Sequence, residues 1–465
     1  MARDRSAQPL SPQDIIRSGL CIGCGSCVAQ ANAVDVRLDF DAFGQYIPRG
    51  PASWRQHRTW GLARTCPFSP LASNEDELAP ALFPDAVQQH AAVGRFHAAY
   101  VGHVAEEDFR AQGSSGGMVS WVLTELLRTG MIEAAVHVVA TADPQQEGRF
   151  FQYQISRTAE AIRAGAKSRY YPVELSSVLR TIRAVPGRYA VVGVPCFIKA
   201  VQLLRREEPL LRARIVCTLG LFCGHMKSAR FLESFAWQLG VGLETIQHVE
   251  FRRKDPQRPA STYTVQLTLT DGRVVQRDWW HLVDGDWGAG FFQHAACNFC
   301  DDVVAETADL SCGDAWVEPY ASDGRGTNVV IVRSTLLAQL VTAGIQAGRL
   351  ALEPVDSAFV ERTQAAGFRQ RREGLAYRLC WPRAAGVRPR KRVAPAARAL
   401  PARRKLIYRT RSGITTWSHR VFWCARLLRQ PHLYIRWARL ALSVYHGLAY
   451  ARGKLGTLLQ RWGLP

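Results

Sequence analysis

Four cysteines near the N-terminus have the spacing of an iron–sulfur ligand set. The run Cys21-Ile-Gly-Cys24-Gly-Ser-Cys27 leaves two residues between successive thiols, and the dipeptide Cys66-Pro67 follows later. A [4Fe–4S] cube needs four thiolates at its corners, and small residues between them let the backbone approach the sulfides. Structural zinc sites are usually built from two paired knuckles, which this triplet does not resemble. The spacing therefore predicts a [4Fe–4S] cluster held by Cys21, Cys24, Cys27 and Cys66.

The N-terminal module is expected to hold one cluster. In two-cluster ferredoxins the triplet continues to a fourth cysteine, followed by Pro, that ligates the other cluster. The equivalent positions here are Ala31 and Asn32. A lone cluster takes its fourth thiolate from a more distant cysteine, and Cys66 is the only cysteine in the chain followed by Pro.

A second set of cysteines follows predicted strand ends. Cys196 and Cys223 each come after an apolar, strand-like run and before a helical segment. Open α/β sheets place their sites at such carboxyl strand ends, and a helix N-terminus favours a thiolate. Together with the pair Cys297-x2-Cys300, they supply four ligands for a second [4Fe–4S] cluster. The alternative is that Cys196 and Cys223 are buried small hydrophobic residues.

The remaining cysteines carry weaker signals. Cys312 lies twelve positions after the last member of the second set and competes for a place in it. Cys217 falls inside a predicted strand, where a buried structural role is the preferred interpretation. Cys380 and Cys424 show no ligand spacing.

A loop of glycines and serines has the composition of an anion-binding turn. Residues 113–117, Gly-Ser-Ser-Gly-Gly, lead into an apolar helix predicted over 118–128. Unpaired N–H groups and the positive end of a helix dipole suit a flavin phosphate, although many such loops are simple turns. The basic and aromatic segment 167–171 is a candidate to hold phosphate and cover a flavin, with a solvated loop as the alternative. The candidate cofactor-binding residues are Ser114, Ser115, Gly116, Gly117, Lys167, Ser168 and Tyr170.

The elements around these residues alternate between strand and helix. Ser11 is a plausible N-cap, with Pro12 at the first helical position, for a short helix that leads to the first cysteine. Asp271-Gly272 marks a hairpin between 263–269 and 273–276. This alternation predicts a mixed α/β domain. The expected strands are 134–140, 189–194, 214–221 and 329–332, and the expected helices are 118–128, 197–205, 228–239 and 336–346.

The positive charge of the chain is concentrated at its C-terminal end. The 465 residues have a formal net charge of +20, but residues 369–465 hold 23 Lys and Arg and one acid, so the rest of the chain sums to −2. The body is therefore nearly neutral, and residues 383–405, rich in Pro and Arg, are expected to form a linker.

The opening residues show no signal-like apolar run, and the longest charge-free run of the tail, 440–451, is too short to span a bilayer. A cytoplasmic protein with free thiols is expected.

In their order along the chain, these motifs resemble the family of beta subunits of coenzyme F420 hydrogenase and dehydrogenase. The resemblance covers about residues 15–335 and includes Phe-Arg-Arg-Lys-Asp at 251–255 and Gly-Asp-Ala-Trp at 313–316. Relatives in this family include 7-hydroxymethyl chlorophyll a reductase and a ferredoxin-dependent divinyl chlorophyllide vinyl reductase. The resemblance implies that the inner cluster is ligated by Cys196, Cys223, Cys297 and Cys300. It disfavours Cys312 as a ligand.

What the resemblance implies is an iron–sulfur flavoprotein oxidoreductase. It would carry two [4Fe–4S] clusters and FAD, and pass electrons between a ferredoxin-like donor and an unidentified small-molecule substrate. The expected domains are a ferredoxin-like module (1–90), a mixed α/β flavin domain (91–370) and a basic helical tail (371–465). His225 and Asp255 are candidate proton donors, although a structural His and a surface Asp are preferred. The alternative function is a non-catalytic, cluster-containing interaction or sensory protein.

The tail lies outside the resemblance. It mixes Arg with apolar residues such as Trp417, Leu433 and Leu440 at helical spacing. This pattern favours a helix on the anionic inner face of a membrane, with cations reaching the headgroups. Packing on the body is the alternative, and nucleic acid binding is less favoured.

Overall fold

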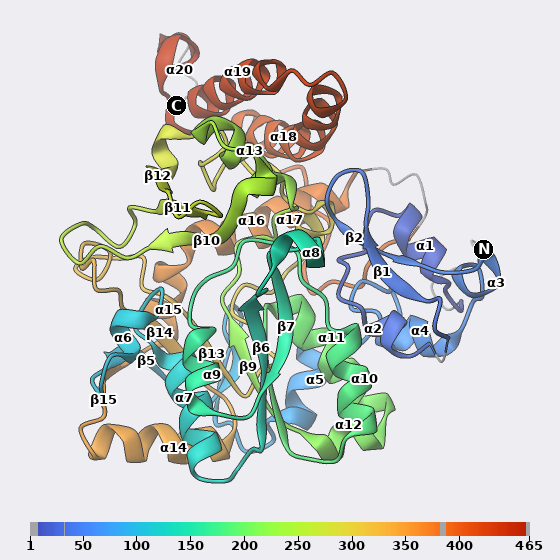
Figure 1. Cartoon of the computed structure of the whole chain (residues 1–465), viewed down its shortest axis with the longest axis vertical. Coiled ribbons are helices and arrows are strands. Elements are labelled where there is room, and N and C mark those ends of the chain that lie inside the picture. Colours follow the sequence, from blue (N-terminus) through green and yellow to red (C-terminus); the bar gives the residue numbers. More distant parts are fainter. Residues whose placement is uncertain (1–7, 32, 382–386, 462–465) are drawn as a thin grey trace.

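A mixed eight-stranded sheet forms the centre of the molecule (Figure 1). The computed structural model describes residues 8–31, 33–381 and 387–461, so Asn32 and part of the expected linker lie outside the described residues. The four central strands β13, β9, β8 and β6 are parallel, and antiparallel strands extend both edges. In spatial order the strands are β15 (Leu350–Val355), β5 (Ala98–Val104), β14 (Asn328–Val332), β13 (Leu310–Asp314), β9 (Ile215–Leu221), β8 (Tyr189–Gly193), β6 (Ala134–Ala140) and β7 (Phe151–Ser156).

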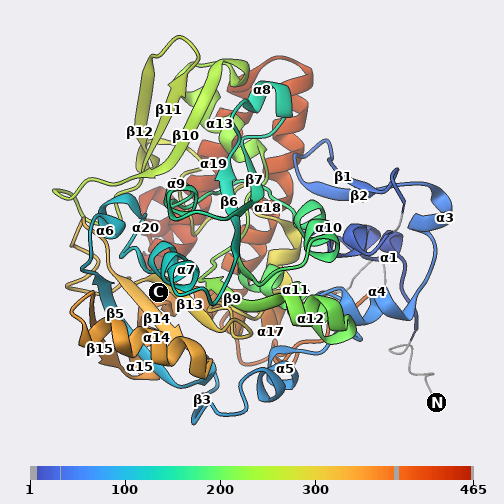
Figure 2. The same ribbon diagram turned by 60° about the horizontal axis from the view of Figure 1, so that its bottom comes forward.

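Helices cover both faces of this sheet, as the two views show (Figures 1 and 2). One apolar cluster joins α7 and α14 to the strands, and another joins α10 and α11 to the strands and to the N-terminal module. The bounds are α6 (Phe109–Gln112), α7 (Met118–Arg128), α8 (Pro144–Glu147), α9 (Ala159–Ala164), α10 (Ser176–Ala184), α11 (Pro195–Glu207), α12 (Pro209–Arg214), α13 (Arg230–Leu239), α14 (Thr335–Gln346), α15 (Ser357–Thr363), α16 (Ala365–Arg371) and α17 (Glu373–Leu379).

The N-terminal module packs beside α10 and α11 (Figure 2). Its first helix begins as expected, because the Ser11 side chain accepts a hydrogen bond from Asp14 N and Asp14 closes a capping box. Its elements are α1 (Pro12–Arg17), α2 (Ser26–Ala29), β1 (Arg37–Phe40), β2 (Tyr46–Arg49), α3 (Ala52–Arg55) and α4 (Trp60–Thr65). The first 90 residues end with α5 (Glu75–Leu82) and β3 (Gln88–His90), and β4 (Gly94–Phe96) leads into the central domain.

The C-terminal helices pack on the body. One face of α18 (Ala402–Leu427) and α19 (Pro431–Tyr450) shares an apolar core with α13 and a three-stranded sheet of β10 (Ile246–Arg253), β11 (Thr264–Leu269) and β12 (Val274–Asp278). Phe422 and Tyr434 are fully buried in this core. A last helix, α20 (Gly453–Arg461), follows. Among the described residues, no helix has the length and apolar character needed to span a membrane.

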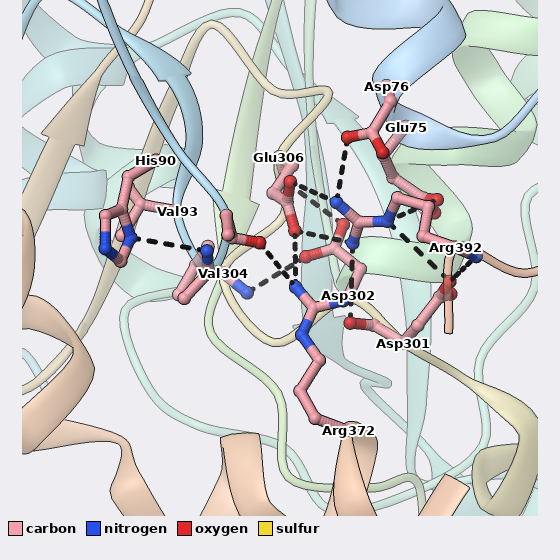
Figure 3. Close-up of polar contacts among 12 residues, drawn as sticks. Glu75, Asp76, His90, Val93, Asp301, Asp302, Val304, Glu306, Arg372 and Arg392 are labelled. Atoms are coloured by element: carbon pink, nitrogen blue, oxygen red, sulfur yellow. Dashed lines mark hydrogen bonds and ion pairs between the residues drawn. The ribbon is translucent and has the colours of Figure 1, made fainter. Parts of the chain in front are cut away.

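The expected linker is held by buried ion pairs rather than solvated (Figure 3). Arg392 makes two contacts of 2.7 Å with Glu306 and one of 3.2 Å with Asp76. Lys391 pairs with Asp301 at 2.9 Å. Lys391, Asp301 and Glu306 are almost completely buried, so the basic residues of the linker tie the C-terminal segment to the N-terminal module and the central domain.

The expected mixed α/β fold is confirmed. The structure has the predicted bounds for α7 and β6, and the predicted hairpin is β11 paired with β12. The helix expected at 197–205 starts two residues earlier, because Pro195 occupies its first turn.

Candidate functional site

The four N-terminal cysteines face one small pocket. Cys21, Cys24, Cys27 and Cys66 line it together, with Leu38 and Pro48 of the β1–β2 hairpin on one side. Cys27 lies in α2, and Cys66 is the C-cap of α4. Three thiols from one loop and one from a later helix end therefore converge, as the spacing predicts.

Two glycines allow this loop its tight path. Gly23 and Gly25 have φ angles of 64° and 84°. A Cβ on Gly23 would lie 2.6 Å from Tyr46 O, and one on Gly25 would lie 2.8 Å from Ser176 N. The first contact is with the backbone of β2 and the second with the start of α10, so only glycine fits at either position.

Burial raises the pKa values of these thiols. It raises the pKa of Cys21 and of Cys66 to about 12. It also raises the pKa of Cys27 well above its ordinary value, and the nearby thiols of Cys21, Cys24 and Cys66 add to the effect. Four grouped thiols that disfavour each other's charge fit a site in which iron ions supply the compensating positive charge.

The four central cysteines form a second group. Cys196 begins α11 after β8, and Cys223 follows β9, so neighbouring parallel strands bring them to the same sheet edge. Cys297 and Cys300 come from the short helix η3 (Ala295–Phe299) and the residue after it. Burial raises the pKa of Cys196 well above its ordinary value, and Cys300, Cys223 and Cys297 raise it further.

The two thiol groups are neighbours. Burial raises the pKa of Cys196, and Cys24 of the N-terminal module adds to the effect of the other inner thiols, so the two groups interact electrostatically. Tyr153 lies near both, because burial raises its pKa and Cys196 and Cys24 add to the shift. All three border a single apolar cluster that spans the N-terminal module and the central domain.

Cys312 and Cys217 lie elsewhere. Both are buried in the apolar cluster between the sheet and α7, on β13 and β9 respectively. Burial alone raises the pKa of Cys312, with no thiol contributing. Cys312 therefore lies apart from the second group, and Cys217 occupies the structural position expected of it.

Buried donors without acceptors surround the second group. Within the described part of the chain, Nε and Nη1 of Arg371, Nε of Arg411 and Nε2 of His225 are buried and have no hydrogen-bond partner. A buried donor without an acceptor is costly. These donors fit an anionic group with several acceptor atoms, such as a cluster with its sulfides and thiolates.

The cysteine geometry differs from that of a single-ion site. Among residues 8–31, 33–381 and 387–461, no group of three His, Cys, Asp or Glu side chains is arranged to hold one metal ion. The four thiolates of a [4Fe–4S] cube do not have to meet at one ion, because each binds a different iron.

The structure brings the glycine-serine loop and the segment after Ala166 together. The Ser168 N–H donates to Ser114 Oγ at 2.8 Å. Gly117, with φ 85°, leads into α7, and a Cβ there would lie 2.5 Å from Phe109 O. The nearby Lys167 ammonium pairs with Glu250 at 2.7 Å. Two segments about 50 residues apart therefore meet beside the N-terminus of an eleven-residue helix.

Tyr170 belongs to an aromatic cluster rather than a solvated loop. Its ring lies 5.0 Å from Trp287, 5.4 Å from Trp279 and 5.7 Å from Phe251, centroid to centroid. Burial raises its pKa. This cluster connects the loop region to the second thiol group, because Trp287 also stacks on His225 at 4.1 Å.

Two motifs with no role assigned from sequence meet at the same loop. Arg252 pairs with Asp314 at 2.9 Å, which joins the 251–255 motif to the 313–316 motif. Lys254 donates to Ser115 O at 2.8 Å and to Arg325 O at 2.7 Å. Burial lowers the pKa of Lys254 to about 7, and nearby cations contribute. The signal was present in the sequence as clustered charge, but the partners are 60 or more residues away along the chain.

The two candidate proton donors occupy different environments. His225 is buried, and its pKa lies well below its ordinary value because of burial and the neighbouring cations Lys227 and Arg411. Asp255 accepts a hydrogen bond from Gln257 N in an exposed turn. Asp255 is therefore the surface residue that was preferred, whereas His225 is buried with its Nε2 unpaired among the described residues and differs from the satisfied structural His that was preferred.

Fold and site together define a mixed α/β protein with two groups of converging thiols beside a glycine-serine loop. Residues 99–180 match the N-terminal part, and residues 187–358 the C-terminal part, of the family described as the beta subunit of coenzyme F420 hydrogenase/dehydrogenase. Together these ranges cover more than half of the chain, so the chain belongs to this family. Membership supports a redox role.

Individual relatives are distant. The beta subunit of coenzyme F420 hydrogenase from Methanothermobacter thermautotrophicus is 22% identical over 259 residues, which are 54% of this chain and 82% of the relative. The F subunit of F(420)H(2) dehydrogenase from Methanosarcina mazei is 24% identical over 223 residues, 46% of this chain and 56% of that protein. A chain of the F420-reducing [NiFe] hydrogenase complex from Methanosarcina barkeri is 15% identical, with a TM-score of 0.48, and the alignment covers 63% of this chain and 95% of that one.

Proposed function

We propose that the chain is an iron–sulfur flavoprotein oxidoreductase with two [4Fe–4S] clusters and FAD. The observation that carries the proposal is the grouping of eight cysteines into two sets that border one apolar cluster, which includes Cys24 of the first set and Cys300 of the second. Neighbouring clusters suit electron relay. Family membership supports the same class of activity.

The outer cluster would be held by Cys21, Cys24, Cys27 and Cys66. Cys21, Cys27 and Cys66 are only partly buried, which places this site near the surface. A ferredoxin-like donor is the proposed partner at this face. The inner cluster would be held by Cys196, Cys223, Cys297 and Cys300, which lie between the N-terminal module and the flavin region.

The proposed flavin site is the loop before α7. A flavin exchanges two electrons with an organic substrate and single electrons with clusters, which is the chemistry the bound groups would supply. The N-terminus of α7, with Ser114, Ser115, Gly116 and Gly117, would bind a phosphate of FAD. Ser168 N–H holds Ser114 in place, and Lys254 fixes the carbonyl of Ser115, so the loop is preorganised.

Tyr170 and its aromatic neighbours would exclude water between this loop and the inner thiols. Lys167 adds positive charge near the loop, although its pairing with Glu250 limits how far it reaches. The proposed substrate is a small organic molecule oxidised or reduced by the flavin. The names of the relatives make coenzyme F420 the first compound to test.

An electron-transfer assay separates this proposal from a sensory or interaction role. The protein is purified anaerobically, its flavin is released for identification, and the bound flavin is reduced with a low-potential donor. An oxidoreductase is reduced through its clusters and is reoxidised by a compound from a metabolite set that includes coenzyme F420. A protein without flavin, or with flavin that no donor reduces, contradicts the proposal.

We also propose that the outer face of α18 and α19 contacts an anionic membrane surface. Trp417, Trp423 and Leu440 are exposed by 52%, 39% and 67%, and Arg420 lies over the Trp417 ring at 5.2 Å. Residues 369–465 hold 23 Lys and Arg and a single acidic residue, so their charge is complementary to anionic lipid. Exposed apolar side chains next to arginine suit the headgroup boundary.

Liposome flotation of the full chain tests the membrane proposal. Vesicles with phosphatidylglycerol should carry the protein upward, and vesicles of phosphatidylcholine alone should not. Leu440→Asp should weaken flotation, whereas Val274→Asp, which changes another exposed apolar residue, on β12, should not. Equal flotation of both variants, or none with wild type, contradicts the proposal.

A further inference from the structure

Arg371 ends α16 and is buried against the inner group of thiols. Its side chain is 3% exposed, and its Nη2 donates to Cys223 O at 2.7 Å and to Gly224 O at 2.8 Å. The family match ends at residue 358, so this arginine comes from a segment outside the matched ranges.

The rest of the guanidinium has no hydrogen-bond partner within residues 8–31, 33–381 and 387–461. A guanidinium carries five N–H groups, and those on Nε and Nη1 of Arg371 find no acceptor among the described residues. Nearly all buried donors in folded proteins are paired. An acceptor that the polypeptide does not provide is therefore expected next to this side chain.

The backbone contacts place the guanidinium at the Cys223 loop, and the charges of the inner thiols act on it. Burial by itself lowers the pKa of Arg371, but Cys300, Cys223 and Cys297 raise it, and the net shift is upward. In return, Arg371 lowers the pKa of Cys223 and Cys297 against the effect of burial. Three of the four inner thiols therefore interact electrostatically with this buried cation.

We infer that Arg371 is the counter-cation of the inner cluster, donating to its sulfur atoms and raising its reduction potential. This inference rests on the proposed inner cluster. One-electron reduction adds a negative charge to the cluster, and a fixed cation with hydrogen bonds to sulfur stabilises that charge. Arg371 would set how readily the inner cluster takes an electron from the outer one.

Arg371 also anchors the Cys223 loop, and its substitution must be separated from loss of structure. Arg371→Met removes the charge and the donors, Arg371→Lys keeps the charge, and Arg369→Gln removes an exposed cation from the same helix. Cys196→Ala gives a reference protein with the outer cluster only, against which the two sets of signals are assigned.

The experiment is an anaerobic redox titration of each full-length variant, followed by electron paramagnetic resonance, with iron content measured in parallel. Arg371→Met should lower the equilibrium constant for reduction of the inner cluster about tenfold, or about 59 mV for one electron. The outer cluster should not shift. Arg371→Lys should lie between wild type and Arg371→Met, and Arg369→Gln should match wild type.

Two results would overturn the inference. One is an unchanged inner potential in Arg371→Met with full iron content. The other is an Arg371→Lys variant whose inner potential falls as far as that of Arg371→Met, because charge would then have no effect. If Arg371→Met loses its inner iron, Arg371→Lys is compared with wild type instead, and a fall of tenfold or more in its equilibrium constant overturns the inference. A wild-type protein with iron for one cluster only would instead refute the proposed function on which the inference rests.

Discussion

Cys24 and Cys196 border the same apolar cluster, although the two residues belong to different modules. Cys24 lies in the loop before α2, and Cys196 begins α11, against which α2 and α4 pack. The two thiol groups therefore lie on either side of the contact between the modules.

Loss of one inner thiol should remove one cluster and leave the other. Cys196→Ala should lower the iron content to about half of wild type, because three thiolates hold a cube poorly. Cys217→Ala is the matched control, since Cys217 is also buried but lies in the apolar cluster of β9. Iron and sulfide analysis after anaerobic purification measures both. Equal iron in the two variants would place Cys196 outside the ligand set.

The loop before α7 should be sensitive to a side chain at its last glycine. Gly117→Ala should cost more than the roughly 1–2 kcal/mol of a left-handed residue, because its Cβ would also meet Phe109 O. Gly130, just after the same helix, has φ 67°, and a Cβ there would have nothing within 4 Å, so Gly130→Ala shows the conformational cost alone. Flavin content and thermal unfolding temperature should fall further in Gly117→Ala. Equal effects would show that the close approach is relieved without cost.

The buried ion pairs of the linker should contribute strongly to stability. Arg392→Ala leaves Glu306 buried without its two 2.7 Å contacts, which should cost about 3–5 kcal/mol. Arg390 pairs with Glu77 at the surface, half exposed, and Arg390→Ala should cost about 0–1 kcal/mol. Chemical denaturation compares the two, and proteolysis should cleave the linker faster in Arg392→Ala. Similar losses of unfolding free energy from both substitutions would show that the ion pairs of Arg392 contribute no more than a surface pair.

Acid should destabilise the chain through His137. Burial lowers the pKa of this residue to about 4, and its Nε2 is 2.8 Å from Ser156 Oγ. Between pH 4 and its ordinary pKa, near 6.5, the unfolded chain binds a proton that the folded chain does not, so stability falls as pH falls. From pH 7 to pH 5 the loss should be about 2 kcal/mol relative to His137→Gln. Chemical denaturation at both pH values measures the free energy of unfolding, and an equal loss in wild type and His137→Gln would contradict this.

Local sequence patterns predicted the strand ends and helix starts that bring Cys196 and Cys223 together. They could do so because an apolar run, a Pro at the first helical turn and a carboxyl strand end are all local features. The role of Arg371 could not be predicted, since one arginine among many gives no sign that its donors lack partners.

The fold of the tail was equally hidden. An Arg-rich amphipathic helix has the same pattern whether its apolar face meets lipid or protein, and only the structure shows Phe422 and Tyr434 buried in the core. Likewise, nothing local to Lys391 or Arg392 indicates the carboxylates of Asp301 and Glu306 with which they pair.

Iron and acid-labile sulfide in the anaerobically purified wild-type chain are the most direct test of two thiol groups holding two cubes. Two cubes require about eight iron and about eight sulfide per chain. About four iron per chain, with the same content in Cys196→Ala, would contradict the presence of two cubes.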